Sequence, residues 1–285
     1  MFELAIFADD ISQDLDRALD VIEELGVKWV EIRSAWSKNL IHQTDEKVEE
    51  VRRAIHSREM RVPCIAAPLF KSRLKGQGQA DAELFHAEEQ DDIDQQLAIL
   101  RRSAELARLF DTNLVRCFSF WKIDGDRERV WADMLEAFQR AIPIAEEEGI
   151  ILVMENDFGC NLGGGGDSAP FIEAVGSPNL KLLWDTGNAY FVGETPYPTG
   201  YEAGKHLLGH VHVKDGVRDP HTGEYRSVAL GSGKVDLLGQ LHALKADGYH
   251  GVVSMENHYT PAGGTPEDGV RESFAGLQRL LAQVD

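Results

Sequence analysis

The chain alternates between short apolar runs and longer stretches in which apolar residues keep helical spacing. The short runs are apolar almost throughout, which is typical of strands buried on both faces of a parallel sheet. They cover residues 2–8, 27–32, 61–67, 114–120, 150–155, 180–185, 210–214 and 251–256. The longer stretches predict amphipathic helices at about 12–26, 44–59, 91–110, 127–148, 168–175, 199–208 and 236–246, and from 265 onward.

Eight strands that alternate with eight helices predict a (β/α)8 barrel. We predict a single domain over residues 1–285, because no linker or change in composition divides the chain. An open doubly wound sheet is the alternative, but no G-x-G-x-x-G follows the first strand. Local signals predict that Ser12 caps the first helix and that Pro143 kinks or divides helix 127–148. The polar stretch at 68–90 is predicted to cover a site or to be disordered.

Composition and charge limit the class of protein. With 43% hydrophobic and 27% charged residues, the composition is that of an ordinary soluble globular protein, and no apolar run approaches the ~20 residues that span a bilayer. The net charge of -19 argues against a nucleic-acid partner, which usually needs a basic patch. Three widely spaced cysteines and an N-terminus without a signal peptide favour a reduced, cytoplasmic protein with no membrane partner. Formation of a homo-oligomer stays open.

Residues of the types that bind metal ions lie at the ends of the last four predicted strands. They are Glu155, Asp185, His212 and Glu256. Because a barrel of this kind carries its site at the C-terminal ends of the strands, we expect these side chains to meet around one divalent metal ion. Three carboxylates with one imidazole suit Mn, Mg or Co, and Zn stays open. His210 shares a strand face with His212, so one is predicted to be the ligand and the other to support it or the substrate.

The ends of these strands resemble the xylose isomerase-like barrel superfamily in the motifs MEN, WDTGN, HVHVKD and SMENH. That group holds ketose 3-epimerases, hydroxypyruvate isomerase, inosose isomerases and dehydratases, and endonuclease IV. In its sugar-converting branch a single divalent metal is held by Glu, Asp, His and Glu. The resemblance assigns these roles to Glu155, Asp185, His212 and Glu256. It also implies that Arg218, six residues beyond that histidine, contacts the substrate.

One departure from the family pattern bears on the reaction. Ketose epimerases and endonuclease IV usually carry a histidine three residues after the aspartate, where this chain has Asn188. Asparagine can bond a substrate hydroxyl, but it is a poorer metal ligand and cannot act as a general acid. The change weakens a strict ketose-epimerase assignment. It weakens an endonuclease IV-like nuclease more, because that enzyme needs three metals.

The resemblance implies isomerisation or epimerisation of a small sugar or cyclitol through a metal-stabilised enediolate, with Glu155 and Glu256 as the two acid/base groups. A dehydratase or lyase that acts on a keto-cyclitol or a 3-keto-glycoside shares the first half of that reaction and is the first alternative. A catalytically idle sugar-binding barrel is the alternative from another class.

Further polar side chains near the strand ends are predicted to contact the substrate, and these are Lys71, Arg116, Asn188, His210 and Lys214. Lys71, Lys214 and Arg116 are predicted to bind a hydroxyl or a phosphate of the substrate. The alternative for each is a structural ion pair. Residues 163–166 are four consecutive glycines, which either let the backbone approach a ligand or form a mobile loop.

Overall fold

The computed structural model describes residues 2–78, 91–219 and 221–284. Eight parallel strands form one sheet in the order β2-β1-β12-β9-β8-β7-β6-β5. The strands are β1 (Glu3–Phe7), β2 (Trp29–Glu31), β5 (Ile65–Leu69), β6 (Leu114–Cys117), β7 (Ile151–Glu155), β8 (Leu180–Asp185), β9 (Leu208–Val213) and β12 (Val252–Met255). Isolated parallel bridges pair Trp29 with Arg61 and Ile32 with Ile65, which closes the ring between β2 and β5. The predicted (β/α)8 barrel is confirmed.

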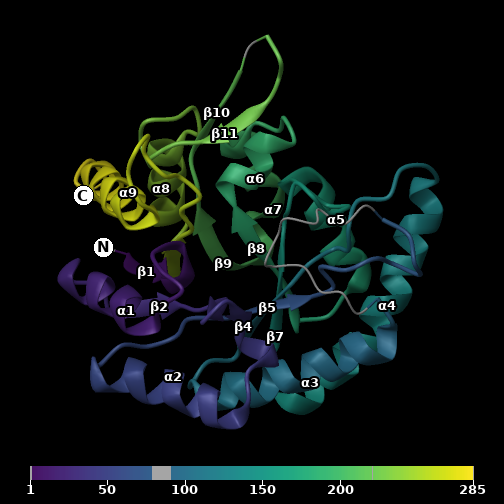
Figure 1. The fold of residues 1–285 in the computed structure, drawn as a ribbon. Helices are drawn as coiled ribbons and strands as arrows, with labels where there is room; N and C mark the ends of the chain where they lie inside the picture. The colour runs from purple at the N-terminus through teal and green to yellow at the C-terminus, as the bar shows by residue number, and fades with distance from the viewer. Residues whose placement is uncertain (1, 79–90, 220, 285) are drawn as a thin grey trace.

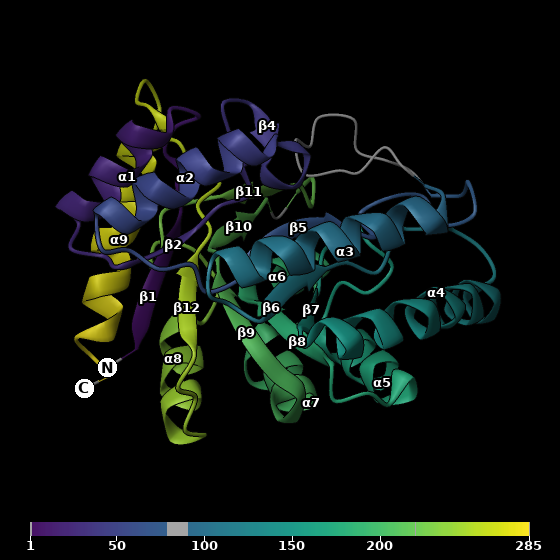
Figure 2. The same cartoon turned by 90° about the horizontal axis from the view of Figure 1, so that it is seen from below.

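Helices surround the strands in both views (Figures 1 and 2). They are α1 (Leu15–Glu24), α2 (Asp45–Ser57), α3 (Ile93–Leu109), α4 (Arg127–Glu148), α5 (Gly165–Val175), α6 (Thr186–Phe191), α7 (Tyr201–Gly204), α8 (Leu237–Ala246) and α9 (Pro266–Leu281). Across the described part of the chain, no helix is both long and apolar enough to cross a membrane.

Aspartates begin several of these helices, because their carboxylates accept hydrogen bonds from backbone amides of the first turn. Asp14 does so for α1, Asp92 for α3 and Asp126 for α4. The predicted cap at Ser12 is therefore wrong. The Ser12 hydroxyl instead accepts a hydrogen bond from the Asp14 amide and orders the turn before the helix.

Of the predicted kink or division of helix α4, the division is wrong, because the helix runs unbroken with Pro143 inside it, and a kink there stays a prediction. Proline removes one backbone donor, but the buried face of α4 continues on both sides of it, and the helix packs between α3 and α5. The predicted helix at 199–208 is instead three short helical turns. Gly204 ends the middle one, and it approaches β8 so closely that a Cβ there would lie 2.5 Å from Leu182 Cδ2.

Two strands differ most from their predicted bounds, since β5 begins at Ile65 and β6 ends at Cys117, whereas the other strand ends lie within two residues of their predicted positions. Phe120 has a φ of 58°, which ends the extended chain after β6. Two hairpins were not predicted, and they are β3 (Ser34–Ala35) with β4 (Lys38–Asn39) and β10 (Gly216–Arg218) with β11 (Tyr225–Ser227). Of the predicted loop at 68–90, residues 79–90 lie outside the described part of the chain.

The interior of the barrel changes from apolar to polar along the strands. Cys64, Val153 and Leu183 form a separate buried apolar cluster. Alternate residues of a strand share one face, so Val153 lies one layer below Glu155, and Leu183 lies one layer below Asp185. This apolar layer closes the barrel beneath the polar side chains at the C-terminal ends of the strands, where barrels of this kind carry their sites.

Candidate metal centre

Four buried side chains meet at the C-terminal end of the barrel. Glu155 and Asp185 are the last residues of β7 and β8, His212 lies in β9, and Glu256 follows β12. Each offers one ligand atom, and these atoms all lie within 4.8 Å of one another. All four residues are at most 3% exposed. The structure therefore brings together the four residues that the strand ends predicted.

Three polar atoms of this group are buried and make no hydrogen bond of good geometry, although the ammonium group of Lys214 forms ion pairs with two of them. They are Asp185 Oδ2, His212 Nδ1 and Glu256 Oε2. Leaving a buried polar atom unsatisfied is costly, and native proteins rarely do so. His212 Nδ1 lies 3.4 Å from Glu256 Oε2 and 3.9 Å from Glu155 Oε1. A divalent cation among these oxygen and nitrogen atoms would satisfy all of them, so the residues present fit a metal ion.

The ammonium group of Lys214 lies among the same carboxylates. Its Nζ is 2.8 Å from Glu256 Oε2, 3.0 Å from Asp185 Oδ2 and 3.7 Å from Glu155 Oε1. Burial opposes its charge, but the three carboxylates outweigh burial and hold the pKa of Lys214 well above its ordinary value. The three carboxylates therefore favour positive charge between them, and Lys214 supplies part of that charge.

An arginine fixes each of the two glutamates. Arg116 Nη1 lies 3.2 Å from Glu155 Oε2, and Arg33 Nη1 lies 2.7 Å from Glu256 Oε1. Asn188 Nδ2 also donates to Glu155 Oε1 at 3.0 Å. Burial by itself raises the pKa of Glu155, but Arg116 and its other cationic neighbours outweigh burial and lower it to about 2. Both carboxylates are therefore held in one orientation, and Glu155 is held in its ionised form.

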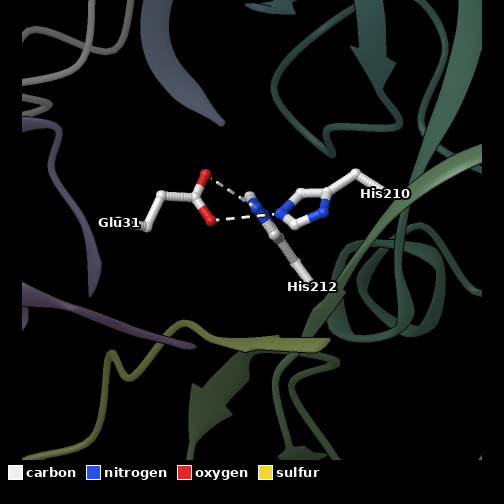
Figure 3. A group of neighbouring side chains, drawn as sticks. All are labelled: Glu31, His210 and His212. Carbon is white, nitrogen blue, oxygen red and sulfur yellow. Dashed lines mark hydrogen bonds and ion pairs between the residues drawn. The ribbon is translucent and has the colours of Figure 1, made fainter. Parts of the chain in front are cut away.

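Glu31 at the end of β2 orients both histidines of β9, and Figure 3 shows its carboxylate facing the two rings. Its Oε1 lies 3.2 Å from His212 Nε2, and its Oε2 lies 3.1 Å from His210 Nε2. Because Glu31 engages Nε2 of His212, the free nitrogen of that ring is Nδ1, which faces the carboxylates. His210 is a supporting residue in this arrangement, since it contacts Glu31 and the Ser254 hydroxyl.

A second buried network supports Glu256. The guanidinium of Arg33 contacts Asp9 and Asp10 at 2.8 Å each, in addition to Glu256. Asp10 also accepts a hydrogen bond from the Asn257 amide at 2.7 Å. Sequence reasoning missed this network and Glu31. Charged residues at the ends of the first two predicted strands were the available signal, but a single acid in such a place is as often a helix cap.

Two predicted substrate-binding residues remain, and these are Lys71 and Arg218. Lys71 lies near the site, but its Nζ pairs with Asp157 at 2.7 Å and lies over the Phe118 ring, so a structural ion pair engages it. Arg218 is exposed, and it donates to the backbone carbonyls of Tyr190 and Phe191 at the end of α6. It contacts none of the four candidate ligands within the described residues. Its substrate contact stays a prediction.

The four glycines at 163–166 are explained by close packing. A Cβ on Gly165 would overlap the carbonyl oxygen of Gly200, and one on Gly163 would lie 2.5 Å from Val192 Cγ1. The amides of Gly165 and Gly166 donate to the carboxylate of Glu194. The run therefore lets the start of α5 lie directly against the segment that follows α6.

Comparisons with known proteins identify the family of this chain. The family model described as xylose isomerase-like TIM barrel matches residues 19–280. A curated relative, inosose dehydratase of Geobacillus thermodenitrificans, is 26% identical over 154 residues. That match covers 49% of this chain and 51% of the relative, so the chain spans about half the length of the curated relative it matches.

Solved structures show the same fold. The IOLI protein, solved with a bound zinc atom, has a TM-score of 0.78 at 16% identity, covering 100% of this chain and 99% of that one. D-psicose 3-epimerase from Clostridium cellulolyticum H10, solved with D-tagatose, has a TM-score of 0.73 at 18% identity, covering 100% of both chains. At such identities the likeness concerns the fold alone. The family match extends over most of the sequence, and this chain is a member of the xylose isomerase-like TIM barrel family.

Proposed function

We propose that this protein is a divalent-metal-dependent isomerase or epimerase of a sugar or cyclitol. The observation that carries the proposal is the convergence of four buried ligand atoms, from Glu155, Asp185, His212 and Glu256, within 4.8 Å of one another, with an arginine beside each of the two glutamates. Glu155, Asp185, His212 and Glu256 would hold the ion, with Mn, Mg, Co and Zn as the candidates. A relative named inosose dehydratase and a structural neighbour named D-psicose 3-epimerase support this class of substrate.

When bound, the ion would polarise a substrate carbonyl and so acidify the neighbouring carbon that bears a hydroxyl. Glu155 and Glu256 then serve as the two acid/base groups. One carboxylate removes the proton from one face of that carbon, and the other, after taking up a proton from water, donates it to the opposite face. Arg116 and Arg33 keep the two carboxylates in place during this exchange. Asn188, which donates to Glu155, is close enough to bond a substrate hydroxyl beside it.

Elimination is the second candidate reaction, and the match to inosose dehydratase favours it. The first proton transfer would be the same. The substrate would then lose a hydroxyl group or an aglycone from the next carbon, and that leaving group needs a proton. His258, whose Nε2 lies 3.2 Å from Glu256 Oε1, and Lys214, whose Nζ lies 2.8 Å from Glu256 Oε2, are the candidate proton donors.

One experiment distinguishes these functions. Metal-loaded protein is incubated with a panel of ketoses, inososes and keto-glycosides in deuterated water and followed by NMR. An isomerase or epimerase incorporates deuterium at carbon without loss of a group, whereas a lyase releases water or the aglycone. Glu256→Gln should abolish the exchange and keep the fold. Unchanged exchange in Glu256→Gln would refute the role of Glu256, and no turnover of any member of the panel would favour the idle sugar-binding barrel.

A further inference from the structure

The dipeptide Glu-Asn occurs at the ends of two barrel strands, as Glu155-Asn156 after β7 and as Glu256-Asn257 after β12. Both glutamates are candidate metal ligands, whereas neither asparagine is one. Asn156 is 0% exposed. A buried side-chain amide is costly unless its donor and its acceptor are both satisfied, so its partners indicate its role.

The Asn156 side chain holds both backbone groups of the candidate ligand Asp185. Its Oδ1 accepts a hydrogen bond from the Asp185 amide at 2.8 Å, and its Nδ2 donates to the Asp185 carbonyl at 3.0 Å. The paired residues of β7 and β8 end at Glu155 and Leu183, two positions before Asp185. Because a primary amide offers the same donor and acceptor as a peptide group, Asn156 continues the ladder where β7 has ended.

The side chain of Asp185 is held from the other direction. Its Oδ1 accepts a hydrogen bond from the Asn188 amide at 2.7 Å, and Asn188 Nδ2 donates to Glu155 Oε1 at 3.0 Å. The contacts form a closed ring that runs from Glu155 through its peptide bond to Asn156, on to Asp185 and Asn188, and back to Glu155. All four residues are at most 1% exposed. The ring does not engage Asp185 Oδ2, which faces Lys214 Nζ at 3.0 Å among the candidate ligands.

The second Glu-Asn pair makes different contacts. Asn257 Nδ2 donates to the carbonyl of Tyr259 at 2.8 Å, and its Oδ1 accepts from the hydroxyl of Ser273, on α9, at 2.6 Å. Neither partner is a candidate ligand. Asn257 therefore fastens the chain after Glu256 to a surrounding helix, whereas Asn156 fastens one candidate ligand to another.

We infer that Asn156 is a positioning residue of the metal centre, which fixes the carboxylate of Asp185 relative to that of Glu155. The inference rests on the proposed function, since it needs a divalent ion among these ligands. Groups that hold the ligands of a metal ion in place typically contribute 10- to 100-fold to its affinity. A residue that only stabilised the ends of β7 and β8 would affect unfolding but not the way the ion is bound.

The test compares Asn156→Ser with Asn257→Ser, which removes a buried asparagine in the same sequence context and leaves the charge unchanged. Isothermal titration of metal-free protein with Co²⁺ should show an affinity about 10- to 100-fold lower for Asn156→Ser and nearly unchanged for Asn257→Ser. The visible absorption spectrum of bound Co²⁺ reports the number and arrangement of its ligands, and it should change in Asn156→Ser alone. Urea denaturation of the metal-free proteins measures the loss of stability that both variants share.

The outcomes separate the inference from the proposed function. An unchanged affinity and Co²⁺ spectrum in Asn156→Ser, or equal losses of affinity in the two variants, would overturn the inference and leave the proposed function standing. If the unmodified protein bound neither Co²⁺ nor Mn²⁺, the proposed function would fall, and the inference with it.

Circular dichroism checks that each variant is folded. Where Asn156→Ser does not fold, Asn188→Ser opens the same ring at its contact with Glu155. This variant should also change the spectrum of bound Co²⁺, and an unchanged spectrum would overturn the inference.

Discussion

The carboxylate of Glu31 engages Nε2 of His212 at 3.2 Å, on the side of the ring opposite the carboxylate cluster. A carboxylate that binds one nitrogen of a ligating histidine fixes both the orientation and the protonated nitrogen of the ring. Here it leaves Nδ1 free to bind an ion. Glu31, at the end of the second barrel strand, therefore orients a candidate metal ligand, His212, on the seventh barrel strand.

Glu31→Gln should lower the affinity for the divalent ion by about 10- to 100-fold, as is typical when the partner of a ligating histidine is changed. The amide can still donate to one ring or accept from one, but it no longer accepts from both histidines. Isothermal titration of metal-free protein with Mn²⁺ measures the change. Glu23→Gln, an exposed glutamate on α1, is the matched control. Equal affinities for both variants would refute the role of Glu31.

The two histidines of β9 should differ in their effect on metal content. His212→Ala removes a candidate ligand atom, whereas His210→Ala removes a side chain that contacts only Glu31 and Ser254 among its described hydrogen-bond partners. We expect His212→Ala to be purified with much less metal than His210→Ala, measured by mass spectrometry of the metal in both proteins. The opposite ranking would make His210 the ligand.

The last four strands of the barrel could be predicted together with their candidate ligands. Three of the apolar runs end directly in an acid, as Leu180–Asp185 does, and the other contains the pair His210 and His212. Glu31 and Arg33 could not be predicted in their roles. Their partners His210 and Glu256 lie 179 and 223 positions away, and nothing in the local pattern of β2 indicates which distant side chain an acid or a guanidinium will meet.

The position of Arg218 depends on a hairpin that was not predicted. The family resemblance implies that Arg218 contacts the substrate, which stays a prediction, and the chain turns into the β10–β11 hairpin directly after Asp215. The Asp215 carboxylate accepts hydrogen bonds from the amides of Gly216, Gly231, Gly233 and Val235, which holds that turn in place. The hairpin carries Arg218 to an exposed position at the end of α6. A hairpin of this kind has only a weak signal in a single sequence.

Asp10 should make stability depend on pH. Burial raises its pKa to about 6, although Arg33 opposes the shift. Between about pH 4 and pH 6 the folded chain holds a proton that the unfolded chain has released, so the free energy of unfolding falls as the pH rises through this range. Asp10→Asn removes that titration. Urea denaturation of metal-free protein at several pH values should show a shallower fall for the variant, and parallel curves would contradict the assignment.

Gly165→Ala should destabilise the fold, because the added Cβ would overlap the backbone carbonyl of Gly200, which cannot rotate away. A forced shift of packed backbone costs about 1–3 kcal/mol. Gly166→Ala is the matched control, since its Cβ would meet only the end of the flexible Glu194 side chain, at 3.1 Å. The measurement is the free energy of unfolding in urea. A large loss for Gly165→Ala alone would show that the glycine run serves packing of α5. A similar gain in both variants, as the higher helix propensity of alanine predicts, would contradict the close approach to Gly200.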